Sequence, residues 1–329
     1  CRLRPMMTHR TLGRSGVQVS RLCFGTMSFG GDADASTSAA MYKACRDAGI
    51  NFYDTADQYN KGKSEEILGN LMKGHRDDLV ITTKCFNPMG EDVNARGNSR
   101  RHVTRAVEAS LKRLGTDRVD ILFLHQFDKL LPIDEQMRAL EDMVRSGKAL
   151  YPAVSNWSAW QTQKALGIQE ANGWARLQVL QPMYNLVKRQ AEVEILPMAL
   201  ANGIGVIPYS PGAAGLLSGK YSGAASGRIK TNKMYEVRYG EKWMFESAER
   251  FVAFCKQRGL HPVSAAVAWV GAHPGITAPI IGARSVEQLQ ASLDSVKIDM
   301  TPALRAEIAA LSRTPPPATD RLEEIKPRP

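Results

Sequence analysis

Four side chains that can carry protons follow consecutive apolar segments of the sequence. They are Asp54, Tyr59, Lys84 and His125. An ammonium beside a phenol favours the phenolate and lowers the tyrosine pKa from about 10, and a carboxylate keeps the lysine charged and in place. We therefore expect Tyr59 to act as general acid or base, with Lys84 adjusting its pKa and Asp54 orienting Lys84. His125 can donate a hydrogen bond that polarises a substrate oxygen.

Such a set can protonate a carbonyl oxygen but cannot reduce it, so the hydride must come from a cofactor. Each residue also has a structural alternative. Asp54 could cap a helix, Lys84 could extend its ammonium to solvent, and His125 could be a hydrogen-bonded core histidine. Their shared position at three consecutive strand ends favours catalysis, because that end of a parallel barrel is its active face.

The elements that must position these residues are short strands alternating with amphipathic helices. We expect strands at residues 21–27, 51–56, 79–84, 120–125, 149–155, 179–185, 205–210 and 277–282, and helices at 37–48, 64–73, 101–114, 133–146, 159–172 and 191–201. Glycines at the expected helix ends are Gly49, Gly74, Gly115, Gly147, Gly173 and Gly203. Eight such units predict an α/β chain folded as a (β/α)8 TIM barrel, with an open doubly wound sheet as the alternative.

Two segments interrupt this alternation. Residues 10–22 alternate with period two around a pair of glycines, which predicts an N-terminal β-hairpin. Residues 211–242 are rich in Gly, Ser and Lys and predict a long loop after the seventh strand, followed by helices at 243–258 and 262–273. We expect one barrel domain over residues 10–313, an N-terminal extension at 1–9 and a Pro-rich tail at 314–329.

Composition excludes several classes of protein. With 43% hydrophobic and 23% charged residues, the chain can bury a large core, and no apolar run predicts membrane insertion. The net charge of +10 is spread along the chain without a nucleic-acid-binding signature, so it suits anionic small ligands better than nucleic acid. Five scattered cysteines predict reduced thiols and a cytoplasmic location, and the six histidines lack metal-ligand spacing, so no metal is expected.

A series of motifs along the chain resembles the aldo-keto reductase superfamily. The motifs are NFYDTADQY at 51–59, SEEILG at 64–69, ITTK at 81–84, DRVDILFLH at 117–125, VSN at 154–156, QPMYN at 181–185, YSP at 209–211, GLLSGKY at 215–221 and GARSVEQL at 282–289. This resemblance implies a (β/α)8 barrel that binds NADPH (NADP+) across its mouth and reversibly reduces an aldehyde or ketone. Asp54, Tyr59, Lys84 and His125 match the family's catalytic tetrad.

The resemblance also implies a cofactor site. Ser155, Asn156 and Gln181 match residues that hold the nicotinamide amide, and Tyr209 matches the aromatic residue stacked on its ring. The other implied cofactor positions are Gly25, Thr26, Asp54, Ser210, Pro211, Gly215, Leu217 and Lys220, with Gly282, Arg284 and Gln288 at the adenosine phosphate. A helix N-terminus beside an arginine suits a 2′-phosphate, so Arg284 favours NADPH over NADH.

The chain departs from the family pattern near this cofactor site. Ala291-Ser292 stand where relatives usually carry Glu-Asn near the adenine, Gly212-Ala-Ala replaces Leu-Gly-Gly, and Pro152-Ala153 replaces Ile-Gly. These departures put the adenine contacts in question and leave the tetrad intact.

The substrate pocket and the wider role of the chain are less constrained. Met27, Phe29, Phe86 and Phe127 follow strands and either line an apolar mouth or pack in the core. The substrate is a small-molecule carbonyl compound whose class stays open, as does the oligomeric state. The alternative function is a cofactor-binding regulatory subunit of a membrane protein, because potassium-channel β subunits resemble the same superfamily.

Overall fold

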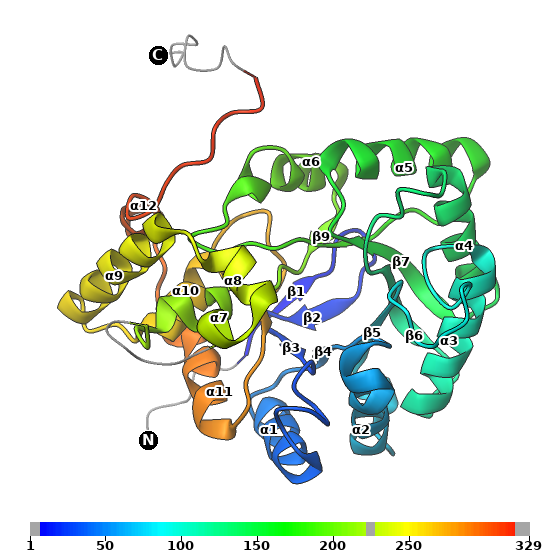
Figure 1. Ribbon diagram of the computed structural model, residues 1–329, viewed down its shortest axis with the longest axis horizontal. Coiled ribbons are helices and arrows are strands. Elements are labelled where there is room, and N and C mark those ends of the chain that lie inside the picture. Colours follow the sequence, from blue (N-terminus) through cyan, green and yellow to red (C-terminus); the bar gives the residue numbers. More distant parts are fainter. Residues whose placement is uncertain (1–6, 222–227, 320–329) are drawn as a thin grey trace.

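Eight parallel strands form a curled sheet that helices surround, as the computed structural model shows (Figure 1). The structure describes residues 7–221 and 228–319. The strands, in sheet order, are β10 (Ile280–Ile281), β3 (Cys23–Gly25), β4 (Phe52–Asp54), β5 (Val80–Cys85), β6 (Val119–Leu124), β7 (Ala149–Ser155), β8 (Val179–Gln181) and β9 (Gly205–Val206). The predicted (β/α)8 barrel is confirmed. Parts of the predicted extension, loop and tail, namely residues 1–6, 222–227 and 320–329, lie outside the described residues.

Backbone hydrogen bonds close the barrel between its two outermost strands. The N–H groups of Thr277 and Ile280 donate to the carbonyl oxygens of Val206 and Pro208, each at 2.9 Å. Most strands are shorter than the sequence predicts, because fewer of their residues pair with a neighbouring strand. Ser210, which falls inside a predicted strand, instead has a left-handed φ of 59°.

The predicted N-terminal hairpin is present and covers the amino end of the barrel. Strand β1 (His9–Thr11) pairs antiparallel with β2 (Gln18–Ser20). Leu12 and Val19 of this hairpin are fully buried in one cluster with the barrel residues Phe52, Ile121 and Val179. The hairpin therefore closes the end of the barrel opposite the carboxyl ends of the strands. The end that carries the carboxyl ends of the strands stays open.

The helices pack their apolar faces on the outside of the sheet. They are α1 (Ala35–Asp47), α2 (Lys63–Leu71), α3 (Arg100–Leu114), α4 (Ile133–Arg145), α5 (Ala159–Asn172), α6 (Ile195–Asn202), α9 (Lys242–Gln257), α10 (Pro262–Gly271), α11 (Val286–Leu293) and α12 (Pro302–Ala309). The six glycines expected at helix ends all have left-handed φ angles, between 63° and 85°. Side chains cap several N-termini, among them Asp34 of α1 and Ser158 of α5, the latter in a capping box with Gln161.

The predicted long loop after β9 contains short helical segments. It contains a 3-10 turn at Ala213–Ser218 and the short helices α7 (Arg228–Thr231) and α8 (Lys233–Tyr239). Asn232 caps α8 by accepting from the N–H of Met234, and the buried rings of Tyr235 and Tyr239 anchor this helix. Helices this short carry too few turns for a hydrophobic period to show in the sequence.

Two glycines in helix interiors are expected to respond oppositely to alanine. A Cβ at Gly69 of α2 would lie 2.6 Å from the carbonyl oxygen of Leu114 in α3, whereas a Cβ at Gly167 of α5 meets nothing within 4 Å. We expect Gly69→Ala to lower the free energy of unfolding by about 1–3 kcal/mol, because α2 must move away from α3. Gly167→Ala should raise it by about 0.5–1 kcal/mol, because alanine loses less backbone entropy.

Urea unfolding of both variants and the wild type measures these changes. A Gly69→Ala variant as stable as the wild type would contradict the close helix contact.

Candidate active site

The open end of the barrel brings together the four proton-carrying residues that the sequence singles out. Asp54 ends β4, Lys84 lies in β5, His125 directly follows β6, and Tyr59 begins the 3-10 turn Tyr59–Gly62. The Lys84 Nζ lies 2.7 Å from Asp54 Oδ2 and 3.4 Å from Tyr59 Oη. The rings of Tyr59 and His125 meet edge to face at 6.1 Å between centroids.

Lys84 is a fully buried cation whose charge is matched by close partners. Its ammonium donates to Asp54 and to the carbonyl oxygen of Thr55, at 2.7 and 2.6 Å. Burial lowers the pKa of Lys84, but the charge of Asp54 and the hydrogen bonds to Asp54 and Tyr59 outweigh burial and leave this pKa raised. The lysine therefore stays charged at neutral pH.

Asp54 is held by hydrogen bonds to its other carboxylate oxygen. Asp54 Oδ1 accepts from Thr82 Oγ1 at 2.7 Å and from Gln181 Nε2 at 2.9 Å. Thr82 is a supporting residue that sequence analysis missed. Its signal was available, because Thr82 precedes Lys84 by two residues in a strand, and such residues share a face of the sheet.

The structure reverses the expected direction of the pKa shift of Tyr59. Burial raises the pKa of the phenol, and the nearby charge of Lys84 opposes this rise only in part. The lysine charge was visible in the sequence, whereas the larger effect of burial was not. Tyr59 is consequently a neutral phenol before reaction and has a proton to donate.

His125 is a neutral imidazole in this site. Burial, followed by the charge of Lys84, lowers the pKa of His125 to about 3. Its Nδ1 atom is buried without a hydrogen-bond partner among the described residues. The backbone is fixed nearby, since Asn156 Nδ2 donates to the His125 carbonyl oxygen at 3.0 Å. A neutral ring suits His125 as a hydrogen-bond donor to a substrate oxygen.

A left-handed turn fixes Tyr59 over the barrel. Asn60, Lys61 and Gly62 have φ angles of 50°, 55° and 89°. The side-chain amide of Asn60 donates to the carbonyl oxygens of Met27 and Phe29, at 2.9 and 2.7 Å. Sequence analysis did not single out Asn60, although asparagine is a residue type that tolerates this conformation.

The residues predicted to hold the nicotinamide form one hydrogen-bonded chain beside Asp54. Tyr209 Oη donates to Asn156 Oδ1 at 2.7 Å, and Asn156 Nδ2 donates to Ser155 Oγ at 3.1 Å. Ser155 Oγ donates in turn to the carbonyl oxygen of Gln181 at 2.8 Å, and Gln181 reaches Asp54. The proposed cofactor and proton-transfer groups are thus joined through one glutamine.

The predicted pyrophosphate segment forms a tight turn beside a lysine. Ala213, Ala214 and Gly215 have consecutive left-handed φ angles of 51°, 56° and 87°, and the N–H groups of Ala213 and Gly215 donate within the turn region to the carbonyl oxygens of Ser210 and Gly212, each at 3.0 Å. The Lys220 side chain crosses this turn, because a Cβ at Gly215 would lie 2.6 Å from Lys220 Nζ. A lysine over such a turn fits an anionic cofactor group.

Several predicted cofactor residues are buried, so their side chains are not accessible to a ligand. Leu217 is fully buried, and Pro211 and Gly25 are buried as well. Thr26 is also fully buried, and its Oγ1 donates to the carbonyl oxygen of Asp54 at 3.2 Å. These residues support the site from within, and only their backbone could meet a cofactor.

The predicted adenosine end lies at the start of α11. The N–H of Arg284 donates to Gln288 Oε1 at 3.3 Å, and Ser285 caps the helix. The Arg284 guanidinium also pairs with Asp32, a contact that sequence analysis did not anticipate. Ala291, one of the departures from the family pattern, lines a hollow of about 390 Å³ between α10 and α11.

The four apolar residues predicted to line the substrate mouth differ in how exposed they are. The Met27 side chain is 47% exposed, and Phe86 is half-buried. Phe127 packs edge to face on Trp157 and also contacts Trp160, whose ring is 61% exposed. Phe29 is fully buried and packs on Phe24, so it belongs to the core and does not reach the mouth.

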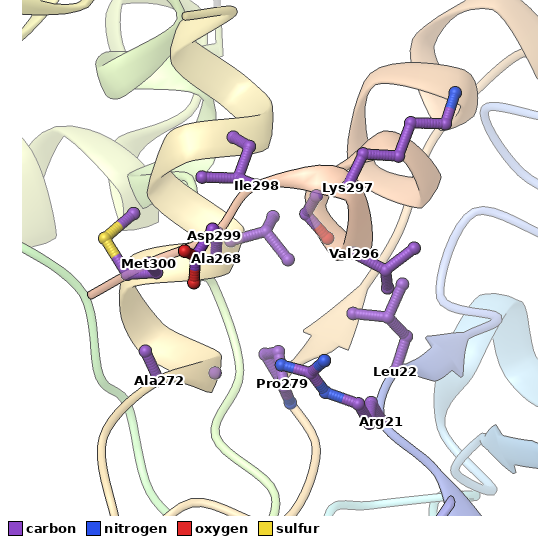
Figure 2. A pocket seen from close by; sticks show the side chains of 13 residues that line it. Arg21, Leu22, Ala268, Ala272, Pro279, Val296, Lys297, Ile298, Asp299 and Met300 are labelled. Atoms are coloured by element: carbon purple, nitrogen blue, oxygen red, sulfur yellow. The ribbon is translucent and has the colours of Figure 1, made fainter. Parts of the chain in front are cut away.

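A separate hollow of about 360 Å³ lies at the other end of the barrel (Figure 2). Arg21 and Leu22, which precede β3, line it together with Pro279, which precedes β10. No member of the Asp54, Tyr59, Lys84 and His125 group lines this hollow, so it is distinct from the candidate active site.

Over residues 7–221 and 228–319, no cluster of three or more His, Cys, Asp or Glu side chains is arranged to hold a metal ion. Within the same ranges, no helix combines the length and the apolar character that a bilayer-spanning helix needs.

The profile of the aldo/keto reductase family matches residues 21–313, nearly the whole chain. The chain belongs to this family and is an oxidoreductase. The family generally uses NAD(P)H, and the positive charge of Lys220 over the turn at residues 213–215 fits such an anionic group.

The relatives to which this chain is similar have names that describe different roles. The chain is 39% identical over 305 residues to the uncharacterized oxidoreductase YrpG of Bacillus subtilis (strain 168), covering 89% of this chain and 92% of the relative. It is 33% identical to the versiconal hemiacetal acetate reductase of Aspergillus parasiticus, over 90% and 94% of the two chains. It is also 33% identical to a probable voltage-gated potassium channel subunit beta of Oryza sativa subsp. japonica, over 95% and 99%.

A buried carboxyl beneath the site is expected to make stability depend on pH. Both oxygens of Asp57 are buried without hydrogen-bond partners among the described residues. Burial, followed by the nearby Glu65, raises the Asp57 pKa from 3.8 to about 7. Between these pH values the folded chain holds a proton that the unfolded chain has lost, so this contribution to stability disappears as pH rises through the window.

We therefore expect Asp57→Asn to stabilise the protein above pH 7, by roughly 1–3 kcal/mol, with little gain near pH 4. Urea unfolding at several pH values measures this difference. Asp47→Asn, at an exposed position in α1, is the control and should show no such pH dependence. An equal gain for Asp57→Asn at pH 4 and pH 8 would contradict the raised pKa.

Proposed function

We propose that this oxidoreductase reduces the carbonyl group of an aldehyde or ketone to an alcohol, using NADPH, and that the reaction is reversible. The observation that carries this proposal is the buried Lys84–Asp54 pair, with Lys84 Nζ 3.4 Å from the phenol of Tyr59. This arrangement suits a proton transfer to oxygen, which carbonyl reduction requires.

Each of the four residues has one task in the proposed reaction. Tyr59 Oη donates its proton to the substrate oxygen, and the ammonium of Lys84 stabilises the phenolate that this transfer leaves. Asp54 holds Lys84 in place, and the neutral His125 donates a hydrogen bond to the same substrate oxygen. A bound nicotinamide cofactor supplies the hydride for the carbonyl carbon. In the reverse direction the phenolate of Tyr59 accepts the proton of the alcohol.

We also propose how the chain holds the cofactor. The side chains of Ser155, Asn156 and Gln181 orient the nicotinamide amide, and the Tyr209 ring stacks on the nicotinamide. Lys220, whose side chain crosses the turn at residues 213–215, meets the pyrophosphate through its positive charge. Arg284 at the start of α11 lies where it can pair with an adenosine phosphate.

We further propose the domain bounds and the cellular location of this protein. We place one barrel domain at residues 10–313, with the extension at 1–9 and the tail at 314–329. We also place the protein in the cytoplasm. Support for this location comes from Cys23, Cys45, Cys85 and Cys255, which are free thiols in the structure.

Tyr59→Phe tests the proposed proton donor. We expect the turnover number to fall by about 10²–10⁴-fold, because the variant keeps the ring and loses the proton. NADPH oxidation, followed by its absorbance with a panel of aldehydes, ketones and quinones, measures this loss. The Kd for NADPH, measured by protein fluorescence, should stay within about three-fold of the wild-type value, because Tyr59 makes no proposed cofactor contact.

Tyr151→Phe is the matched control, since Tyr151 lies in β7 with its hydroxyl near Ser15 of the hairpin, at the opposite end of the barrel. This variant should turn over substrate like the wild type. Full activity in Tyr59→Phe would exclude Tyr59 as the donor.

A second candidate function rests on the similarity to the rice channel subunit, which spans almost the full length of both chains. In this role the barrel binds the cofactor and regulates a membrane protein. NADPH binding without turnover of any carbonyl compound, together with saturable binding to a purified potassium channel, would favour it over the reductase. Rapid turnover with no channel binding would exclude it.

A further inference from the structure

A carboxylate faces the arginine at the predicted adenosine end of the cofactor site. Asp32 Oδ2 lies 3.2 Å from Arg284 Nε, and the two side chains are 49% and 40% exposed. Asp32 follows β3 and Arg284 follows β10. These strands are hydrogen-bonded neighbours in the barrel, so the loops at their carboxyl ends lie side by side.

The loop that carries Asp32 is tightly organised. The N–H groups of Gly31 and Ala33 both donate to the carbonyl oxygen of Ser28, and Gly30 has a left-handed φ of 72°. Ser28 Oγ donates to the carbonyl oxygen of Ala283, at 2.7 Å, and so ties this loop to the residue before Arg284. The carboxylate is therefore held beside the arginine by the backbone as well as by its charge.

The ion pair itself adds little to stability, because both partners are about half exposed. Its importance lies in what a ligand would meet. A phosphate monoester carries a charge of about −1.5 to −2 at neutral pH. A 2′-phosphate that pairs with Arg284 must also lie close to the carboxylate of Asp32 and is repelled by it. The hydroxyl groups of an unphosphorylated ribose can instead donate hydrogen bonds to a carboxylate, as they do in many dinucleotide sites.

We propose that Asp32 is a specificity-determining residue that reduces the preference for NADPH over NADH set by Arg284. The inference rests on the proposed function, because it assumes that the adenosine end of the cofactor reaches Arg284. Arg284 attracts the 2′-phosphate, and Asp32 opposes it and accepts hydrogen bonds from the ribose of NADH. The two side chains together make the site accept both cofactors.

Asp32→Asn tests the proposal, with binding as the readout. The full chain is titrated with NADPH and with NADH, and the Kd values come from isothermal calorimetry. We expect the Kd for NADPH to fall about ten-fold, because one like charge leaves a half-exposed site, while the Kd for NADH stays unchanged or rises. The gain for NADPH should shrink as ionic strength increases, because salt screens exposed charges.

Asp77→Asn is the matched control. Asp77 is also an exposed aspartate paired with an arginine, Arg118, but it precedes β5 at the opposite end of the barrel. Its replacement changes the net charge equally and should leave both Kd values within two-fold of the wild-type values.

The outcomes separate this inference from the proposed function. If both cofactors bind and Asp32→Asn changes neither Kd, or changes both equally, the role of Asp32 is wrong and the reductase proposal stands. If neither cofactor binds the wild-type chain, the proposed function fails and the role of Asp32 fails with it. A ten-fold gain for NADPH alone, absent from Asp77→Asn, supports the inference.

Discussion

The buried ion pair between Lys84 and Asp54 is the interaction on which the site depends. A fully buried ammonium is costly unless it is paired and hydrogen-bonded. Asp54 supplies the opposite charge, and Thr55 supplies a carbonyl oxygen. Gln181 binds the other carboxylate oxygen and reaches back toward Ser155. The charge that would stabilise a phenolate is therefore held by β4, β5 and β8 together, and no single strand could hold it.

Burial, more than any neighbouring charge, sets the protonation states around this pair. It raises the pKa of Tyr59, lowers that of His125 to about 3 and raises that of Asp57 to about 7. Two groups beside one ammonium thus take different roles, a phenol that can give up a proton and an imidazole that stays neutral. Lys84 itself stays charged because the charge of Asp54 and the hydrogen bonds to Asp54 and Tyr59 outweigh the cost of its burial.

The relatives include enzymes and probable channel subunits. These different roles fit a barrel in which the proposed proton-transfer groups and the peripheral loops lie on different parts of the chain. The groups proposed to transfer protons lie at strand ends or shortly after them, within a hydrogen-bonded network. The proposed adenosine end lies on two surface loops, where Asp32 and Arg284 are about half exposed. Surface positions can change charge at little cost to the fold, so cofactor preference can change without disturbing Lys84 and Asp54.

Sequence alone favoured the barrel over an open sheet and predicted its hairpin, its glycine helix ends and the residue types that converge at its mouth, because hydrophobic period and strand-end polarity are local properties. Only the tertiary structure decided what depends on burial and on contacts between distant segments. It moved Phe29 into the core, reversed the pKa shift of Tyr59 and anchored α8 through Tyr235 and Tyr239. It also brought Asp32 to Arg284 across 252 positions, because β3 and β10, which are far apart in the sequence, pair as neighbours in the folded sheet.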